Sequence, residues 1–478
     1  MRIRFAAVAV LLTALATACC SAPPSLSMMA GRSRAAVHGS ISPAVDDLQH
    51  RSFNFFWETT NPKNGLVPDR WPTKSFSSIA AVGFALTAYP IAVERGWVTR
   101  AAARDRVLTT LHFFAEAPDG ASAPGIVQEH GFYYHFLDMD TGARFKDVEL
   151  STIDTTLLVA GALVCEQYFD RNDADETTIR ALADAMYRRI DWVWAVQRAP
   201  KVSMGWTPEK GFSTYDWSGY NEAMILYVLA IGSPTHAVDP KAWRAFTSTY
   251  HWGTFYDQQY VQFVPLFGYQ YSQLWIDPRG IRDEYLRGHG IDYFENSRRA
   301  TLAQRAYAIA NPGGWKDYGE NLWGLSACDG PLDGLVTIDG KDRKFWTYAA
   351  RGASADETRD DGTIAPTAAA SSMPFAPEIV GPAIEAMRRR GDERLYSTYG
   401  FLDAFNPTLT LPVAKFGVVD SQHGWVDVDY LGIDEGPIVG MIENYRSGLI
   451  WNLMRKNPYI ILGLQRAGFT GGWLDGVK

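Results

Sequence analysis

Helical periodicity is the dominant pattern in this 478-residue sequence, and it extends along almost the whole chain after residue 41. Apolar residues recur at spacings of three and four, which predicts helices rather than strands. In the first half, the predicted helices begin near Ser42, Ser77 or Ser78, Thr99, Ser151, Asp175 and Ser218. In the second half the pattern is looser and predicts helices near 265–276, 296–310, 372–389, 392–400, 437–453 and 456–467.

About twelve helices joined by alternately short and long loops predict an all-α fold, an (α/α)6 barrel of helical hairpins closed into a ring. A few short β-strands are expected among the long loops at the cleft end, at 131–136, 255–264 and 335–338. The sequence has no sustained βαβ alternation, and it has no fixed repeat period of the kind that marks an α-solenoid. In such a barrel the long loops gather at one end and form a cleft.

The first 18 residues have the features of an export signal. Arg2 and Arg4 are followed by the apolar run Phe5–Leu15 and by the small residues Ala16–Ala18, a typical cleavage site. The run is too short for a permanent transmembrane helix, which needs ~20 residues. Leu15 to Cys19 is similar to a loose bacterial lipobox, which predicts lipidation of Cys19. Plain cleavage into the periplasm or medium is the alternative.

Residues 19–41 are rich in Ser, Ala and Pro, which predicts a flexible tether. Residues 42–478 contain no internal linker, and we expect them to form a single catalytic domain. We expect a monomer that is periplasmic or anchored in the outer membrane by its lipid. Cys165 lies in an apolar run, as a small buried side chain would. A disulfide between Cys165 and Cys328 is compatible with export but not required. No Cys/His cluster has zinc spacing, and neither a metal nor a cofactor is expected.

Composition narrows the class of ligand. The formal net charge is −8 with no basic block, which argues against nucleic acid. Neither a GxGxxG nor a P-loop pattern is present, which argues against a nucleotide. The 16 Trp, 23 Tyr and 24 Phe amount to 13% of the chain, and many lie beside Gly, Asp or Asn in predicted loops. Trp and Tyr combine a flat apolar face with a polar edge, which suits sugar rings. A carbohydrate ligand is therefore favoured.

The first polar stretch runs from Asp138 to Thr155 and places several acids just before a predicted helix. Ser151 and Asp154 have capping-box-like spacing, and acids at this position interact favourably with the helix dipole. For Ser151 this structural role is the preferred interpretation. Glu149 and Asp154 fit equally well as cleft residues, because a loop-to-helix junction is where a barrel presents polar groups. With Asp138 they are candidates for binding a substrate.

The second stretch leads to Glu222, which begins an otherwise apolar helix after Trp217 and Tyr220. A carboxyl beside aromatic residues loses solvent, and its pKa rises, as a general acid requires. The alternative is a first-turn glutamate stabilised by the helix dipole, which would lower the pKa instead. The aromatic neighbours favour a catalytic Glu222, with Trp217 and Tyr220 as candidate substrate contacts.

Two further stretches carry candidate substrate-binding residues. One alternates Asp and Arg, which predicts structural ion pairs, but Tyr293, Asn296 and Arg298 are candidates for lining a polar cleft. The other contains Trp323 and Asp329, where Asp329 and the following glycine form a turn signal. A tight loop accounts for that signal, and binding of sugar hydroxyls by Asp329 is the functional alternative.

The fifth stretch contains Asp434 and Glu435 just before Gly436-Pro437, which should open a helix. Both acids are therefore expected on the loop before that helix, facing the cleft. Glu443 lies three residues before Arg446, and a helix-surface ion pair is the simple interpretation. Glu443 is also a candidate substrate-binding residue.

Together, these stretches resemble the bacterial glucoamylase-like family of (α/α)6-barrel glycoside hydrolases, which includes endo-β-1,2-glucanases and the related domain of cyclic β-1,2-glucan synthases. The resemblance extends from about Phe53 to Leu464. Its carriers are Asp69-Arg70, Glu94-Arg95-Gly96-Trp97, Ser151-Thr152-Ile153-Asp154-Thr155, Tyr220-Asn221-Glu222, Tyr293-Phe294-Glu295-Asn296-Ser297-Arg298 and Asp434-Glu435-Gly436-Pro437. The resemblance implies an exported enzyme that hydrolyses a β-glucan with inversion, and it implies that Glu222 is the general acid.

The general base is less well determined by the resemblance. Asp434 is the first candidate, and Glu435 is a rival because the family pattern has Gln where this sequence has Glu. Glycoside hydrolysis needs one protonated carboxyl for the leaving oxygen and one ionised carboxyl, and in inverting enzymes the latter activates water. The resemblance also implies indirect proton routes through a substrate hydroxyl and a chain of water molecules.

The resemblance predicts an endo-acting β-1,2-glucanase that releases short gluco-oligosaccharides. Another β-glucan linkage, exo action and phosphorolysis are alternatives on the same fold, although no clear anion site supports phosphorolysis. A non-catalytic surface glucan-binding protein is an alternative of another class, but binding alone does not need several loop carboxyls. An α-helical interaction scaffold leaves the aromatic loops unexplained.

Overall fold

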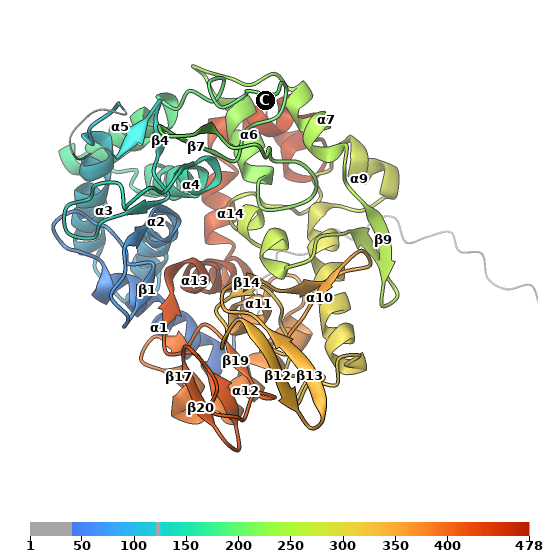
Figure 1. Ribbon diagram of the computed structural model, residues 1–478. Helices are drawn as coiled ribbons and strands as arrows, with labels where there is room; N and C mark the ends of the chain where they lie inside the picture. The colour runs from blue at the N-terminus through green and yellow to red at the C-terminus, as the bar shows by residue number, and fades with distance from the viewer. Residues whose placement is uncertain (1–40, 121–124, 126, 478) are drawn as a thin grey trace, which may run out of the picture. The chain divides into compact units, whose positions relative to one another are not determined.

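The computed structural model describes residues 41–120, 125 and 127–477 (Figure 1). The predicted signal peptide, Cys19 and nearly all of the predicted tether lie outside the described residues, so export and lipidation stay predictions. Within the described ranges, none of the helices is long and apolar enough to cross a membrane. In the same ranges, Cys165 and Cys328 are buried free thiols.

Six helices with mostly buried residues form an inner ring, and neighbouring members pack side by side (Figure 1). They are α2 (Ile79–Glu94), α4 (Thr152–Tyr168), α6 (Met224–Gly232), α8 (Tyr271–Trp275), α11 (Pro366–Ala370) and α13 (Gly432–Arg446). The contact of α13 with α2 closes the ring. Just before α8, Gln270 donates from Nε2 to the Ala368 carbonyl oxygen at 2.8 Å and so ties that segment to α11.

An outer layer of helices covers the inner ring. Its main members are α1 (Pro43–Thr59), α3 (Arg100–Ala115), α5 (Ala174–Arg188), α10 (Tyr293–Ala310), α12 (Pro377–Leu395) and α15 (Pro458–Arg466). Shorter elements are α7 (Lys241–Thr247), η1 (Leu266–Tyr269), α9 (Glu284–His289), α14 (Leu449–Met454) and η2 (Gly472–Gly476). This two-layered arrangement confirms the predicted (α/α)6 barrel. Inner helices are buried on nearly all sides because both their faces are covered, whereas outer helices keep one exposed polar face.

Short antiparallel strands connect the loops. The pairs are β1 (Arg70–Trp71) with β22 (Tyr430–Leu431), β2 (Ser77–Ser78) with β5 (Phe136–Leu137), β3 (Gln128–Glu129) with β4 (Phe132–Tyr133), β9 (Trp252–Phe255) with β10 (Gln258–Val261), β11 (Ala327–Cys328) with β14 (Ala349–Ala350), β12 (Gly334–Ile338) with β13 (Lys341–Phe345), β15 (Gly352–Ala353) with β16 (Thr358–Arg359) and β17 (Tyr396–Ser397) with β18 (Gly400–Phe401). The three-stranded sheets are β6 (Leu150–Ser151), β7 (Gly205–Thr207), β8 (Gly211–Phe212) and β19 (Phe405–Asn406), β21 (Gly424–Val426), β20 (Val418–Asp420).

Three of these strands lie directly before inner helices. β2 leads directly into α2, β6 into α4 and β22 into α13. The predicted strands at the loop end of the barrel are therefore present. The extended segment predicted over 255–264 is instead largely the hairpin β9–β10, because Tyr256 and Asp257 adopt positive φ angles of 45° and 62° and turn the chain.

Predicted helix starts agree with the structure where a side chain caps the helix. The side-chain oxygens of Ser42, Ser78, Thr99 and Ser151 each accept a hydrogen bond from a backbone N–H in the first turn. The helix predicted over 392–400 is wrong, because α12 ends at Leu395 and the chain turns into the hairpin β17–β18. Gly400, with φ of 104°, lies in that hairpin.

The helix predicted to open at Pro437 begins five residues earlier, at Gly432, so Asp434 and Glu435 lie in its first turns and not on a preceding loop. Pro437 has no N–H to bond the carbonyl oxygen of Ile433. The hydroxyl of Tyr271 donates to that oxygen at 3.3 Å, which satisfies the acceptor that the proline leaves open. Tertiary packing therefore allows proline inside α13.

Helices α2 and α4 approach each other closely at two glycines. A Cβ added to Gly161 would lie 2.1 Å from the carbonyl oxygen of Gly83, and a Cβ added to Gly83 would lie 2.2 Å from that of Leu157. Only residues without a side chain permit this approach. The contact is part of the ring that carries the site described below.

We predict that Gly161→Ala forces α2 and α4 apart and lowers the free energy of unfolding by ~1–3 kcal/mol, as overpacking does. Gly288→Ala in α9 is the control, because nothing lies within 4 Å of its added Cβ. The control should be neutral or stabilising by up to ~1 kcal/mol, since Ala favours helix more than Gly. Denaturant unfolding of both variants measures the difference, and equal stability of the two would contradict the close-contact argument.

Candidate active site

Three of the predicted acids converge from three inner helices. Asp154 lies in the first turn of α4, Glu222 lies two residues before α6, and Asp434 lies in the first turn of α13. All three face the Tyr271 side chain at the start of α8. Burial is the main cause of the raised pKa of Tyr271, and the charges of Asp434, Glu222 and Asp154 raise it further. The acids therefore share one site at the N-terminal ends of the inner helices.

Glu222 has the protonation behaviour of a general acid. Burial raises the pKa of Glu222 to about 7, and the nearby charge of Asp154 raises it further. The Ser272 hydroxyl donates to the Glu222 carbonyl oxygen at 2.5 Å, and the Ala223 N–H donates to Asn221 Oδ1 at 2.9 Å. Glu222 lies before the helix and not at its start. Its pKa is raised, which is opposite to the shift that a helix dipole would produce.

Trp217 and Tyr220 are buried supports next to Glu222. The Trp217 indole nitrogen donates to Thr152 Oγ1 at 3.0 Å, which ties the Glu222 loop to α4. The Tyr220 hydroxyl accepts from Gln273 Nε2 at 3.2 Å, and its ring packs on Tyr269 with centroids 4.9 Å apart. The prediction that both rings bind substrate directly is therefore corrected: they are covered by protein and help to remove solvent from this region.

His135 joins the two acids of the first predicted stretch. Its Nδ1 lies 2.8 Å from Glu149 Oε1, and its Nε2 lies 3.4 Å from Asp154 Oδ2. Burial opposes protonation of His135, but Asp154 and Glu149 outweigh it and raise the pKa to about 9. Asp154 also accepts from the Ser151 hydroxyl, and its own N–H donates back to Ser151 Oγ at 3.2 Å. The capping role expected for Ser151 is present, and substrate binding by Glu149 and Asp154 stays a prediction.

Asp434 lies beside a second group of acids that sequence analysis largely missed. Its carboxyl is hydrogen-bonded to that of Asp403, and burial together with Asp434 raises the pKa of Asp403 well above its ordinary value. Burial also raises the pKa of Asp434, to about 7, while the bond from Asp403 lowers it. Two such carboxyls titrate as a pair. The proton resides on Asp403, which leaves Asp434 as the ionised partner above neutral pH.

Asp329, Asp403 and Asp427 form an acid cluster next to this pair. One carboxylate oxygen of each lies within 4.8 Å of the others. The Asp329 N–H donates to Asp403 Oδ2 at 2.6 Å, and Arg70 NH1 lies 2.6 Å from Asp329 Oδ2. Burial raises the pKa of Asp427 to about 9, so protonation together with Arg70 limits the net charge of the cluster.

Glu435, the rival base, is directed differently from Asp434. Successive residues of a helix point about 100° apart. Glu435 is buried near Ser52 of the outer helix α1, and burial raises its pKa well above the ordinary value, opposed by the Ser52 hydroxyl. A protonated carboxyl between two helices is poorly suited to activate water in the cleft.

Glu443 is not in the cleft. It is 0% exposed, and its oxygens lie 3.0 Å from Gln49 Nε2 and 2.6 Å from Ser447 Oγ. Nine residues of α13 separate it from Asp434, about 13 Å along the helix axis. The prediction that Glu443 binds substrate is wrong, because it lies at the opposite end of the barrel and joins α1 to α13.

The third stretch also has structural roles. Arg298 NH2 lies 2.6 Å from Glu378 on the outer face of the barrel, and Arg298 NH1 donates to the Phe375 carbonyl oxygen at 2.7 Å. Asn296 is fully buried and accepts from the Val261 N–H at 2.8 Å. Tyr293 donates to Asp283 Oδ2 at 3.0 Å. These residues belong to the outer helix α10, so none of the three reaches the cleft directly.

Two further predicted substrate contacts differ from expectation. Trp323 is fully buried in the core and offers no surface to a ligand. Asp138 caps its own turn, accepting from the Thr141 N–H at 2.8 Å, and this bond lowers the pKa of Asp138. In the folded protein, Trp323 therefore contributes to packing of the core, and Asp138 stabilises a turn.

Tyr348 is a cleft residue that sequence analysis missed. Its side chain is 55% exposed, and its phenol lies close to Asp434 and Asp403. A cavity of about 620 Å³ adjoins it, lined by Lys344, Trp346, Tyr348, Ala349, Ala350, Glu357, Thr358 and Arg359. Two aromatic rings in a polar cavity match the faces and hydroxyl groups of sugars. The two aromatics are the only sequence signal that marked this segment.

We predict a pH-dependent stability that comes from His135. The folded-state pKa of about 9 exceeds the ordinary value of 6.5, so the stabilisation is complete below pH 6.5 and disappears as the pH rises through 9. Melting temperatures of wild type and His135→Gln should therefore converge between these values. The exposed His236 supplies the control, His236→Gln, whose curve should run parallel to wild type. Parallel curves for His135→Gln would contradict the ion pairs assigned here.

Comparison with known proteins places these features in a family. A family model described as "Putative glucoamylase" matches residues 214–458, which include Glu222, the acid cluster and Asp434. Among curated proteins, the exo β-1,2-glucooligosaccharide sophorohydrolase (non-reducing end) of Parabacteroides distasonis is 30% identical over 456 residues. That match covers 88% of this chain, and the chain spans 57% of the length of this relative.

Solved structures agree in fold and in sequence. A "putative glucoamylase" from Bacteroides uniformis superposes with a TM-score of 0.78 and 31% identity, over 91% of this chain and 100% of its own. An endo-β-1,2-glucanase from Chitinophaga pinensis, solved with sophorotriose and glucose, has a TM-score of 0.76 and 27% identity, over 91% of this chain and 100% of its own. Because the family model matches more than half of the chain and these structures share its barrel, the protein belongs to the glucoamylase-like family.

Proposed function

We propose that this protein is an exported glycoside hydrolase that cleaves β-1,2-glucan with inversion, at bonds within the chain. The observation that carries the proposal is the division of protonation between two acids in one cleft. Glu222 holds a proton near neutral pH, because burial raises its pKa to about 7. Burial raises the pKa of Asp434 to about 7 as well, but Asp434 accepts a hydrogen bond from Asp403, which carries the proton of the pair, and this bond favours the ionised form of Asp434. Hydrolysis of a glycosidic bond needs one acid of each kind.

Each acid then has one task. Glu222 protonates the leaving glycosidic oxygen, directly or through a substrate hydroxyl. Asp434 accepts a proton from the attacking water, and Asp403, whose pKa is raised well above the ordinary range, keeps its own proton. The ordered contacts of His135 keep Asp154 paired beside Glu222. That negative neighbour favours the protonated form of Glu222 until proton transfer occurs.

The linkage is proposed from the relatives. Two of them are described as acting on β-1,2-linked glucose, one as a sophorohydrolase and one as an endo-glucanase. Endo action is proposed from the likeness to the endo-glucanase, which extends over 91% of this chain and 100% of that one. The cavity at Tyr348 gives room for further glucosyl units in either mode of action. Exo action is the second candidate, because the curated relative at 30% identity is described as acting at the non-reducing end.

Export is proposed from the first 18 residues, whose basic, apolar and small-residue segments match a signal peptide. A β-glucan polymer is a substrate outside the cytoplasmic membrane, which fits this origin. A lipid on Cys19 would keep the enzyme at the membrane, and residues 19–41 would let it reach the polymer. Mass spectrometry of the mature N-terminus distinguishes lipidation from simple cleavage.

The purified enzyme, incubated with a panel of linkage-defined glucans, should release short oligosaccharides from linear β-1,2-glucan. A ladder of products early in the reaction indicates endo action, whereas disaccharide alone from the start indicates exo action. Glu222→Gln should keep the fold and lose ~10²–10⁴-fold in kcat, since it removes the acid proton. Near-normal turnover in that variant, or no product from β-1,2-glucan, would overturn the acid assignment or the substrate respectively.

Asp434→Asn and Glu435→Gln separate the two base candidates. The first should lower kcat by ~10²–10⁴-fold, because it removes the acceptor for the water proton. The second should retain most of kcat, because a protonated Glu435 near Ser52 is close in shape and hydrogen bonding to glutamine. Circular dichroism checks that both variants fold. The reverse ranking of kcat would assign the base to Glu435.

A further inference from the structure

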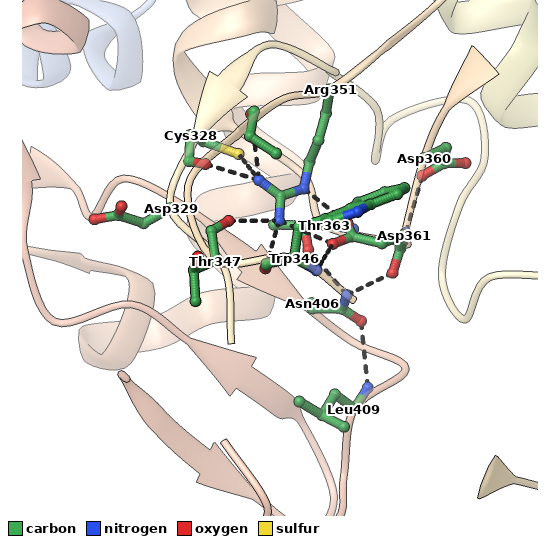
Figure 2. A network of polar contacts seen from close by, with 12 residues as sticks. Cys328, Asp329, Trp346, Thr347, Arg351, Asp360, Asp361, Thr363, Asn406 and Leu409 are labelled. Atoms are coloured by element: carbon green, nitrogen blue, oxygen red, sulfur yellow. Dashed lines mark hydrogen bonds and ion pairs between the residues drawn. The ribbon is translucent and has the colours of Figure 1, made fainter. Parts of the chain in front are cut away.

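Arg351 is a fully buried cation behind the cleft, with an exposed fraction of 0%. Its guanidinium forms two bonds to Asp361, from Nε to Oδ1 at 2.7 Å and from NH2 to Oδ2 at 2.8 Å (Figure 2). Burial by itself lowers the pKa of a guanidinium, but Cys328 and Asp361 outweigh it and raise the pKa of Arg351. The ion pair is therefore charged, and both of its members are held in place.

One peptide group connects Arg351 to the catalytic acids. Arg351 NH1 donates to the Cys328 carbonyl oxygen at 2.7 Å. The N–H of the same peptide group, that of Asp329, donates to Asp403 Oδ2 at 2.6 Å. A cation on the carbonyl side polarises a peptide and strengthens its N–H as a donor. Arg351 thereby strengthens the hydrogen bond that Asp403 accepts from this peptide group. Asp403 is in turn hydrogen-bonded to Asp434.

The same guanidinium fixes the strand connection that carries Tyr348. Arg351 NH2 donates to the carbonyl oxygens of Trp346 and Thr347, at 3.0 and 3.1 Å (Figure 2). Asp361 accepts from the Trp346 N–H at 3.1 Å. The two residues before Tyr348 are therefore held at their backbone, and the exposed Tyr348 ring is anchored from behind.

Asp361 extends the network to the other side of Asp403. Its carbonyl oxygen accepts from Asn406 Nδ2 at 2.9 Å, and Asn406 also donates to Thr363 Oγ1 at 3.0 Å (Figure 2). Asn406 lies three residues after Asp403. The segment that carries Asp403 is thus held at Asp403 itself, through the peptide of Asp329, and again at Asn406.

We propose that Arg351 is a positioning residue for the general base, and that it acts on Asp434 through the Cys328–Asp329 peptide and Asp403. This proposal rests on the proposed hydrolytic function of Asp434. Arg351 does not touch the cleft, so its effect on catalysis passes through the geometry and the charge that it imparts to Asp403. The same residue holds Tyr348, which links the base to the neighbouring sugar-binding cavity.

Several charged groups besides Arg351 act on Asp403, and they come from different elements. They are Asp434 and Glu435 of α13, Asp329 after β11, Asp427 after β21, Arg70 of β1, and the Tyr348 phenol and Cys328 thiol. Replacing Arg351 and Asp361 together leaves all of these groups in place and does not change the net charge, so a change in titration is attributable to loss of the Arg351–Asp361 pair and of its bond to the Cys328 carbonyl oxygen.

Three variants separate charge from geometry. Arg351→Lys keeps a charge but loses the planar fork that serves Asp361 and Cys328 together. Arg351→Met combined with Asp361→Asn removes the ion pair without leaving one buried charge alone. Arg100→Met is the matched control, because Arg100 pairs with Glu176 at 2.7 Å with similar geometry but lies on the outer layer. It should reduce stability and leave the pH profile of activity unchanged.

We expect kcat to fall ~10- to 100-fold in both Arg351 variants, the effect of misplacing a group near the reacting atoms. KM should change much less. The acidic limb of kcat/KM reports ionisation of the base in the free enzyme. It should move to higher pH in the double variant, because the bond from Arg351 that polarises the Cys328–Asp329 peptide toward Asp403 is lost. In Arg351→Lys that limb should move less. Loss of stability with unchanged kcat and an unchanged limb would overturn the positioning role.

A second readout keeps this test independent of the substrate. Carbon-13 carboxyl titration of aspartate-labelled enzyme, with Asp403→Asn to assign the signals, follows the Asp403–Asp434 pair without turnover. The pair should titrate at higher pH in the double variant than in wild type and in Arg100→Met. An unshifted titration overturns the inference even where wild type hydrolyses β-1,2-glucan. A shifted titration in an enzyme that cleaves no glucan supports the positioning role and rejects the proposed function.

Discussion

Burial of carboxyl groups at the N-terminal ends of the inner helices is the constraint on which the site depends. An ionised carboxylate removed from water is strongly destabilised unless it is paired or protonated. The protein meets this constraint in different ways at its three central acids. Burial favours the protonated form of Glu222, Asp154 is paired with His135, and Asp434 accepts a hydrogen bond from Asp403, which carries the proton of that pair. The different solutions give chemically similar side chains different protonation states, which is what acid–base catalysis requires.

The barrel makes this arrangement rigid. Gly83 and Gly161 bring α2 and α4 into backbone contact, and the carbonyl oxygen freed by Pro437 is bonded by Tyr271 of α8. Neighbouring inner helices are thus joined by specific contacts close to the acids they carry. Behind them, the Arg351–Asp361 pair holds the backbone at Cys328, Trp346 and Thr347, next to Asp329 and Tyr348. Figure 2 shows these bonds of Arg351. Side chains from distant parts of the chain therefore keep a fixed geometry with few mobile elements.

Sequence patterns were reliable where the interaction they report is local. Serine and threonine caps marked helix starts because the capping bond spans only three residues. Sequence patterns gave wrong predictions where one local pattern is compatible with two different structures. Pro437 suggested a helix start but lies inside α13, and Glu443 looked like a surface or cleft acid but is buried at the far end of the barrel. Asp434 and Glu435 are neighbours in sequence, and only the direction of each side chain from the helix separates their roles.

Periodicity and local motifs were enough to predict the helical content, the closed barrel, the family resemblance and Glu222 as the candidate acid, because each of these is recorded in neighbouring residues. Only the tertiary structure brought His135 to Asp154, Asp403 to Asp434, and Arg351 to the peptide of Asp329. The physical reason is that a pKa depends on solvent exclusion and on charges a few ångströms away. In a barrel of this kind, those charges come from loops that lie far apart along the chain, so no local pattern records which of them meet.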